Sequence, residues 1–371
     1  MKIMHIADLH IGRTINQHPL LADQSYMLDQ LIKEVDHQQI ELVIIAGDIY
    51  DRTLPSKEAV QLFESFIHQL NIERKLPVLA VSGNHDGASR LGYGKEWFRT
   101  HQFYLSTAIE DCFKPVTLKE IDFYLLPYIE PAEAKIYFND DTIQTHKESY
   151  EKIVEEINAQ KNSGRKSVIV SHLFIQGGQE SDSERPLSMG AVEFVPQSVF
   201  KGFDYVALGH LHHPFAIQSD TIFYSGSLLK YSFSEASQPK GYRLVTIDEG
   251  VKSIFMPLKP LRDLQVIEGD YAAMIDNHQS IESEHYYQFI LHNMRHIKDP
   301  MTRLKAVYPN LLELRYAEDS KADKEIKVEV DERSDIEIIE QFAMNMTDEP
   351  LTHNQQQIIA RLLKEVQHET Y

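Results

Sequence analysis

Short apolar runs in the first two thirds of the chain each end abruptly at aspartate, asparagine or histidine. The runs cover residues 3–7, 42–46, 78–81, 168–170 and 205–208. Continuous apolar runs of this length are typical of buried strands covered on both faces. Helical patterns lie between several of them, at 23–38, at 56–71 with Pro55 at its start, and at 145–162. Strands that alternate with helices predict a layered α/β fold.

The polar residues that follow these runs are expected to meet at one edge of the sheets. They are Asp8, His10, Asp48, Asn84, His172, His210 and His212. In α/β folds, ligands bind beyond the carboxyl ends of the strands. Aspartate, asparagine and histidine suit Mn²⁺, Zn²⁺ or Fe²⁺, and the lack of cysteine argues against a thiolate site. The sequence therefore predicts a metal centre.

The spacing of these residues favours two ions. The side chains of Asp8-x-His10 can both turn toward one cation, and the Asp48 carboxylate can bridge two through its two oxygens. Two ions about 3.5–4 Å apart can clamp the attacking and leaving oxygens of a phosphoryl group and activate water near neutral pH. Each motif is weak alone, but their combined order predicts phosphoester hydrolysis.

The pattern changes after Pro260 and predicts three parts. We expect a catalytic domain at 1–258, a smaller α+β domain at 262–332 and a helical segment at 336–371. The charged segment 318–335 is read as solvated surface in preference to a binding tail. The terminal segment predicts amphipathic helices at 336–345 and 354–366. They can pack on their own domain or dock on a partner.

Composition adds limits. The chain has 371 residues, 42% of them hydrophobic, with a mean hydropathy of −0.35. We expect no signal peptide, no membrane association and a cytoplasmic location, and Cys112 as a buried small residue. The net charge of −19 argues against nucleic acid. Two bound divalent cations would restore about four positive charges locally, and a partner can supply the rest.

Longer stretches give the motifs a family resemblance. Asp8-x-His10, Gly47-Asp48-x-x-Asp51, Gly83-Asn84-His85-Asp86, His172 and Gly209-His210-x-His212 match the calcineurin-like metallophosphoesterases in order and type. Residues 172–174 with 180–185, 203–212 and 226–235 resemble the SbcD family, the nuclease subunit of the bacterial SbcC–SbcD complex. Leu228 stands where that family commonly has proline. The resemblance implies a β-sandwich flanked by helices, a capping domain and a C-terminal helix pair.

The resemblance also implies roles for individual residues. One ion would bind Asp8, His10, Asp48 and His212, and the other Asp48, Asn84, His172 and His210, with Mn²⁺ preferred and Mg²⁺ as a weaker substitute. His85 would contact the scissile phosphate and protonate or stabilise the leaving oxygen. We expect the Asp51 carboxylate to orient the His85 ring, although Asp51 can also be a cap or turn residue. Asp86 is expected to be a turn or support residue.

Basic side chains near the motifs are candidates for DNA contact, since guanidinium matches phosphate oxygens. Arg52 is the first choice because it follows Asp51, and Arg13 and Arg90 are further candidates. Lys230 and Tyr231 are weaker ones, and Tyr231 fits a packing role equally well.

The resemblance implies a DNA nuclease with double-strand exonuclease and single-strand endonuclease activity in DNA repair and recombination. It also implies a homodimer that acts with an SbcC-type coiled-coil ATPase. This chain has no Gly-x-x-x-x-Gly-Lys-Ser/Thr loop, so any use of ATP must come from a partner. The alternative is a metallophosphatase, or a cyclic or aryl phosphodiesterase, acting on small molecules or phosphoproteins with the same ligands. A scaffold with a decayed site is disfavoured because no ligand position is missing.

Overall fold

The structure is a computed structural model that describes residues 1–184, 194–276, 284–294, 297–317, 334–347 and 350–368. The chain forms two compact units, Met1–Ala317 and Glu318–Tyr371. Within the described residues, no helix is both long and apolar enough to cross a membrane.

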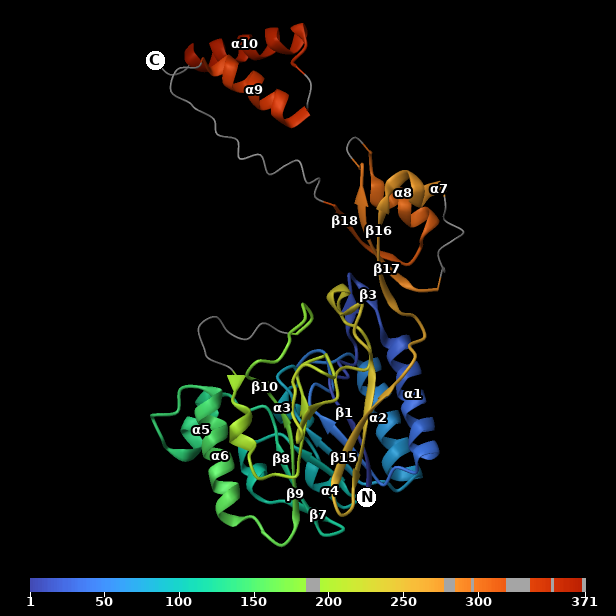
Figure 1. The fold of residues 1–371 in the computed structure, drawn as a ribbon, viewed down its shortest axis with the longest axis vertical. Helices are drawn as coiled ribbons and strands as arrows, with labels where there is room; N and C mark the ends of the chain where they lie inside the picture. The colour runs from blue at the N-terminus through green and yellow to red at the C-terminus, as the bar shows by residue number, and fades with distance from the viewer. Residues whose placement is uncertain (185–193, 277–283, 295–296, 318–333, 348–349, 369–371) are drawn as a thin grey trace. The chain divides into compact units, whose positions relative to one another are not determined.

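Two sheets form the centre of the first unit (Figure 1). The six-stranded sheet has the order β15-β14-β1-β4-β5-β6, and the five-stranded sheet has the order β13-β12-β9-β8-β7. The strands of the first are β1 (Lys2–Ile6), β4 (Leu42–Ala46), β5 (Val78–Val81), β6 (Phe103–Ser106), β14 (Gly241–Ile247) and β15 (Val251–Pro257). Those of the second are β7 (Val116–Leu118), β8 (Ile121–Leu126), β9 (Lys166–His172), β12 (Tyr205–Gly209) and β13 (Ile222–Tyr224). Strands β1, β4 and β5 run parallel, as do β8, β9 and β12.

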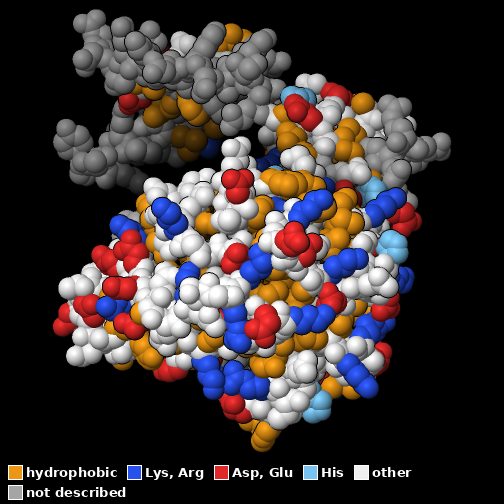
Figure 2. All heavy atoms as spheres, turned by 60° about the horizontal axis from the view of Figure 1, so that its bottom comes forward, with side chains coloured by type: hydrophobic (Ala, Val, Ile, Leu, Met, Phe, Trp, Pro, Cys, Tyr) orange, Lys and Arg blue, Asp and Glu red, His pale blue; other side chains and the backbone are white. Residues whose placement is uncertain are grey.

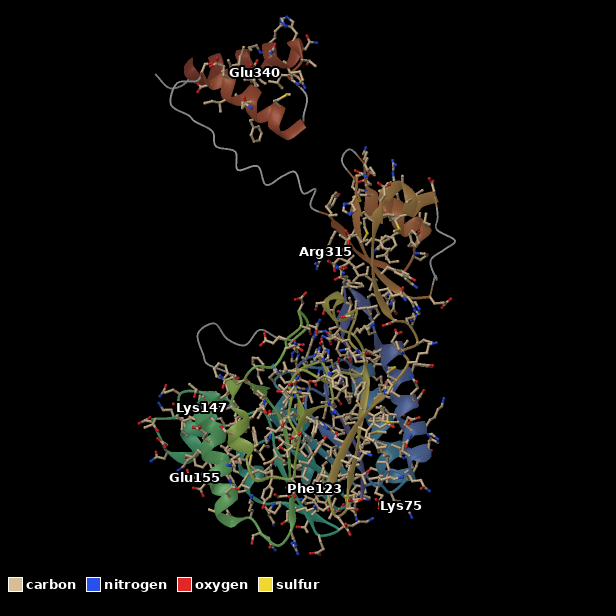
Figure 3. The ribbon with its side chains drawn as sticks, in the orientation of Figure 1. Lys75, Phe123, Lys147, Glu155, Arg315 and Glu340 are labelled. Carbon is tan, nitrogen blue, oxygen red and sulfur yellow. The ribbon has the colours of Figure 1, made fainter. Side chains whose placement is uncertain are left out.

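Three apolar layers hold the sheets and helices together. The middle layer lies between the sheets and contains Ile3 and Phe123, the latter labelled in Figure 3. A second layer packs α1 (Leu21–Gln38) and α2 (Lys57–Ile67) on the first sheet, and a third packs α6 (His146–Gln160) on the other. The order helix, sheet, sheet, helix confirms the expected fold class. It also explains the continuous apolar runs, because both faces of each central strand are covered.

Local signals explain where the helices begin. The Ser56 side chain accepts a hydrogen bond from the Ala59 amide and caps α2, and Thr145 forms a capping box with Glu148 at the start of α6. The helix expected at 56–71 is present, but its last turn has another form: the α-helix ends at Ile67, and a π-helical turn η1 (His68–Glu73) continues it.

Short elements connect the sheets. They are β2 (Thr14–Ile15), β3 (His18–Pro19), α3 (Ala88–Leu91), α4 (Lys95–Arg99), η2 (Ile109–Phe113), α5 (Pro131–Phe138), β10 (Phe174–Ile175), β11 (Phe194–Val195), η3 (Gln197–Phe200) and η4 (Phe233–Glu235). Cys112 in η2 is fully buried, as expected, and burial raises the pKa of its thiol.

Residues 264–316, referred to below as the smaller domain, form a three-stranded parallel sheet, and a helix lies in the described part of each connection. The domain contains β16 (Leu264–Asp270), α7 (Tyr271–Asp276), β17 (Tyr286–His292), α8 (Pro300–Val307) and β18 (Leu311–Tyr316). Its own core packs Phe289 of β17 against Leu304 of α8. The strands expected at 286–291 and 311–316 are therefore present.

The first turn of α1 joins this smaller domain to the loop that follows β1. The Asp23 carboxylate accepts hydrogen bonds from Arg262, at 2.8 and 3.0 Å, and from the Tyr286 hydroxyl at 2.9 Å. The neighbouring Gln24 side chain accepts from the Gly12 amide at 2.9 Å and donates to the His10 carbonyl at 2.7 Å. Asp23 thus bonds the smaller domain, and the adjacent Gln24 bonds the loop after β1.

The second unit contains α9 (Asp335–Thr347) and α10 (His353–His368), close to the two helices expected there. Gln356 donates to Glu340 at 2.8 Å and links them. Phe342, Ile358 and Leu362 are exposed within this unit. Most of the charged segment 318–335 lies outside the described residues.

Candidate metal centre

Seven polar side chains gather where the central strands end. Asp8 and His10 follow β1, Asp48 follows β4 and Asn84 follows β5. His172 ends β9, and His210 and His212 follow β12. The ligand atoms of Asp8, His10 and His212 lie within 4.8 Å of one another, as do those of Asp8, Asp48 and His172. All seven except Asn84 are buried.

His10 and His212 face each other through ring nitrogens. Their Nε2 atoms are 3.1 Å apart, and His10 Nε2 is 3.5 Å from Asp48 Oδ2. His10 Nδ1 is buried and finds no hydrogen-bond partner among the described residues. Two nitrogen lone pairs and a carboxylate oxygen that converge in a buried space fit a divalent cation well.

His172 faces a second group of potential ligand atoms. Its Nδ1 lies 2.9 Å from the Ala46 carbonyl, which can only accept, so Nδ1 donates, and Nε2 carries the lone pair whenever the ring is neutral. That Nε2 is 3.0 Å from Asn84 Oδ1 and 3.4 Å from Asp48 Oδ2. The facing groups also suit a cation.

Asp48 lies between the His10–His212 pair and His172, and only one of its two carboxylate oxygens approaches both sides. Oδ2 approaches both His10 and His172, whereas Oδ1 accepts the backbone N–H of His85 at 2.9 Å. In this arrangement Oδ2 is the Asp48 oxygen nearest to both histidines, and the expected use of both oxygens for two cations stays a prediction.

Asp8 and His210 complete the cluster. The Asp8 carboxylate accepts the His210 amide at 3.0 and 3.1 Å, and the His210 ring lies edge-on to the His172 ring with centroids 5.3 Å apart. The backbone is strained at four of these positions, where φ is 52° at Asp8, 43° at His10, 48° at Asp48 and 109° at His210. Residues other than glycine rarely adopt positive φ, and such strain collects at functional sites.

Two glycines allow the strand ends to approach this closely. A Cβ on Gly83 would lie 2.1 Å from Asp48 Oδ1, and one on Gly209 would lie 2.0 Å from the Ala46 carbonyl oxygen. Any larger residue at either position would push a ligand loop away.

Burial and mutual attraction shift the pKa values of the ionisable groups at this site in different directions. It raises the pKa of Asp8 to about 7 and lowers that of His210 to about 3. Burial also opposes the charged forms of Asp48 and His172. Their mutual attraction nevertheless holds the pKa of Asp48 well below its usual range and raises that of His172 to about 9. Without a cation, His172 itself supplies the positive charge that the carboxylates need.

His85 lies beside the cluster and is oriented by backbone. Its Nδ1 is 2.9 Å from the Asp51 carbonyl oxygen, and its Nε2 is 4.0 Å from Asp48 Oδ2. The expected contact with the Asp51 carboxylate is wrong, because that carboxylate pairs with Arg13 at 2.9 Å. Asp51 therefore holds the ring through its main chain.

Asp86 is a support residue, as expected. Its carboxylate accepts backbone N–H groups of Ile49, Tyr50 and Gly83 at 2.9–3.2 Å. Burial, with Asp48 nearby, raises its pKa to about 7.

The basic candidates differ in their freedom to reach DNA. Arg52 is largely exposed, with 72% of its side chain accessible. Arg13 is held between Asp51 and the Ser183 carbonyl, and Arg90 lines an apolar groove of about 710 Å³.

Two weaker candidates have structural partners. Tyr231 is buried and donates its hydroxyl to the Leu9 carbonyl, so it is a packing residue. The Lys230 ammonium donates to the Ala236 carbonyl and to Asp263.

Sequence reasoning missed the residues around His212. Ser183, Glu184, Glu235 and Lys240 surround its ring and backbone. The first three lie in stretches noted only for their family resemblance, and nothing in the sequence pointed to Lys240. Burial opposes ionisation of Glu235, but Lys240 and His212 keep its pKa well below the usual range.

Comparison with protein families agrees with this geometry. Residues 1–214 match the calcineurin-like phosphoesterase family. Residues 260–347 match SbcD_C, a family described as the type 5 capsule protein repressor C-terminal domain. The first match covers more than half of the chain and includes every candidate ligand. With both domains on one polypeptide, the chain belongs to the calcineurin-like phosphoesterases and is a metal-dependent enzyme of the SbcD type.

Proposed function

We propose that this protein is a DNA nuclease that uses two divalent ions, with Mn²⁺ preferred. The observation that carries the proposal is the presence of an SbcD-type C-terminal domain on the same chain as a complete phosphoesterase ligand cluster. Asp8, His10, Asp48 and His212 would hold one ion, and Asp48, Asn84, His172 and His210 the other. When bound, the ions would neutralise phosphoryl oxygens and activate water.

The chain's own contribution to the chemistry centres on His85. With Nδ1–H donated to the Asp51 carbonyl, the ring is held with Nε2 toward the ligand cluster. In the imidazolium form, Nε2–H can donate to the leaving oxygen of the scissile phosphate while Nδ1–H keeps its bond. Arg52 is exposed beside this position and is the basic side chain best placed for a neighbouring phosphate.

The acidic charge limits how the chain itself holds DNA. On the face that Figure 2 shows, Lys and Arg side chains are interspersed with Asp and Glu, without a continuous basic patch. Because the whole chain carries a net charge of −19, we place part of the DNA affinity on an SbcC-type coiled-coil ATPase. The exposed apolar side chains of α9 and α10, such as Phe342 and Ile358, are the proposed docking surface. Deleting 336–371 should then abolish co-purification with the ATPase.

We place the homodimer contact at the apolar groove between α2 and α4. Trp97, Tyr93 and Ile72 line the groove and are 69%, 75% and 46% exposed. Thr53 and Gly87 also line it and lie two residues from Asp51 and His85. A second copy bound here would therefore support both catalytic loops. Trp97→Glu should give a monomer by light scattering, whereas a dimer of unchanged stability would contradict this placement.

A cleavage assay separates the proposal from the alternative phosphatase. Purified protein with Mn²⁺ is offered linear duplex DNA, circular single-stranded DNA and an aryl phosphodiester. We expect metal-dependent cleavage of both DNA substrates, with ATP dependence when the ATPase partner is added. Intact DNA together with rapid hydrolysis of the aryl phosphodiester would establish the alternative instead.

A further inference from the structure

The back of the His212 ring contacts a buried polar cluster that has no place in the proposed ligand set. Ring Nε2 faces His10, so Nδ1 points away from the proposed ion. Nδ1 lies 2.7 Å from Ser183 Oγ and 3.2 Å from Glu235 Oε1. His212, Ser183 and Glu235 are all buried, so water does not compete for these contacts.

Glu235 is charge-balanced by Lys240. The Lys240 ammonium contacts Glu235 Oε2 and also donates to the His212 carbonyl at 3.0 Å and to Ser227 Oγ at 2.9 Å. Glu235 is 0% and Lys240 6% exposed. A buried charge persists only when it is paired and hydrogen-bonded, and this pair meets both conditions. Glu235 is therefore an ionised carboxylate, which can only accept hydrogen bonds.

These contacts determine which ring nitrogen of His212 carries the proton. The Ser183 hydroxyl donates to Glu235, so its oxygen is free to accept from Nδ1–H. In this arrangement Nδ1–H, Ser183 and Glu235 are all satisfied. The other tautomer would set the Nδ1 lone pair against a carboxylate oxygen at 3.2 Å. The Nδ1–H tautomer leaves the lone pair on Nε2, toward His10.

The backbone of His212 is fixed by the same region. Its N–H donates to Glu184 Oε1 at 2.7 Å, and Glu184 Oε2 accepts the Ser181 amide. The ring and the main chain of one residue are thus held by side chains from two segments, 181–184 and 235–240.

We propose that Glu235, with Lys240 as its counter-charge, is a positioning residue that fixes His212 as the Nδ1–H tautomer and presents Nε2 to the ion shared with His10. The inference rests on the proposed role of His212 as a ligand. Carboxylates that accept the second N–H of a ligating histidine typically contribute about 10–100-fold in metal affinity.

The test removes both charges together. The double variant Glu235→Gln, Lys240→Met avoids leaving one buried charge unpaired, which would destabilise the protein. Mn²⁺ titration of the full chain by calorimetry should show one site weakened by about 10–100-fold and the other unchanged. Asp122→Asn is the matched control, because Asp122 is a buried carboxylate that bonds Thr117 and contacts Arg165, with no metal ligand among its partners. It should bind both ions normally.

The outcomes are distinct. A double variant that unfolds at the wild-type temperature and binds both ions with wild-type affinity overturns the role of Glu235. A wild-type protein that binds no pair of ions overturns the dinuclear site itself, which is a different failure.

A measurement on the unaltered chain covers a variant that does not fold. In ¹⁵N-histidine NMR of the Zn²⁺-loaded protein, assigned with His212→Gln, His212 should be protonated at Nδ1 and metal-bound at Nε2. Protonation at Nε2 would overturn the proposal.

Discussion

The Nε2 atoms of His10 and His212 face each other across 3.1 Å although the two residues are 202 positions apart in the chain. His10 lies in the loop after β1 of the six-stranded sheet, and His212 lies in the loop after β12 of the five-stranded sheet. Two nitrogens that present lone pairs to each other repel unless a cation or a proton lies between them. The folding of two sheets against each other therefore creates a place that a metal ion can occupy.

Loss of Asp48 should affect both ions at once. Its Oδ2 approaches His10 on one side and His172 on the other. We expect Asp48→Asn to bind fewer than two ions by elemental analysis and to lose at least about 100-fold in activity, or about 2.7 kcal/mol. Full metal content in this variant would contradict the shared position.

Loss of His85 should separate catalysis from metal binding. The ring bonds the Asp51 carbonyl and belongs to neither proposed ligand set. His85→Leu should lower kcat by about 10²–10⁴-fold while calorimetry still finds two Mn²⁺ ions. Retained activity would remove His85 from the mechanism, and loss of both ions would make it part of the site's framework.

The arginines should differ in how they affect DNA binding. Arg52 is exposed, so Arg52→Ala should remove one phosphate contact and reduce the slope of log affinity against log salt by about 0.9. Arg13 is tied to Asp51 and Ser183, so Arg13→Ala should instead lower the thermal stability of the site. Arg165→Ala, which breaks a contact with Glu120 away from the ligands, is the control for binding. An unchanged salt slope in Arg52→Ala would argue against the DNA contact.

Gly209 should be intolerant of a methyl group. A Cβ there would lie 2.0 Å from the Ala46 carbonyl oxygen, so Gly209→Ala must displace β4 or the loop that carries His210. We expect a loss of at least about 1–3 kcal/mol of stability and weakened Mn²⁺ binding. At Gly250 a Cβ meets nothing within 4 Å, so Gly250→Ala should change neither quantity appreciably. Equal behaviour of the two variants in denaturation and calorimetry would contradict this packing.

His5 should make stability depend on pH. Burial, reinforced by Arg243, lowers the pKa of the His5 ring from its ordinary value of 6.5 to about 3 in the folded chain. Between these values the unfolded chain holds the proton and the folded chain does not, so stability rises with pH from about 3 to 6.5 and is complete above that. One such group contributes a slope of up to about 1.4 kcal/mol per pH unit. Urea denaturation of the metal-free protein from pH 4 to 7 gives the unfolding free energy as a function of pH. In His5→Gln its slope should be smaller than in the wild type by the contribution of one bound proton, and an unreduced slope would refute the assignment.

The cluster of candidate ligands was accessible from sequence because its members stand singly or in pairs at the ends of five buried strands. A buried apolar run that stops at Asp48 or His172 marks the carboxyl end of a central strand, and such ends converge in any layered α/β fold. The same logic predicted a layered α/β fold with covered strands, whereas the second sheet was implied only by the family resemblance.

Contacts made by backbone or by distant residues could not be obtained in this way. Residue types suggest that the Asp51 carboxylate serves His85, but the turn places the Asp51 carbonyl there and sends the carboxylate to Arg13. Glu235 and Lys240 meet His212 only because the segment after β13 returns to the site, which no spacing rule encodes. The π-helical turn after Ile67 likewise has no local signature in an otherwise helical pattern.

The adjacent residues Asp23 and Gln24 make the first turn of α1 a connection between two parts of the protein. The Asp23 side chain bonds Tyr286, the first residue of β17 in the smaller domain, and the Gln24 side chain bonds the loop that carries His10. Because these two side chains are adjacent on one helical turn, a displacement of Tyr286 that moves this turn would also move the His10 carbonyl. The smaller domain and the candidate metal centre are thus connected mechanically through two neighbouring residues.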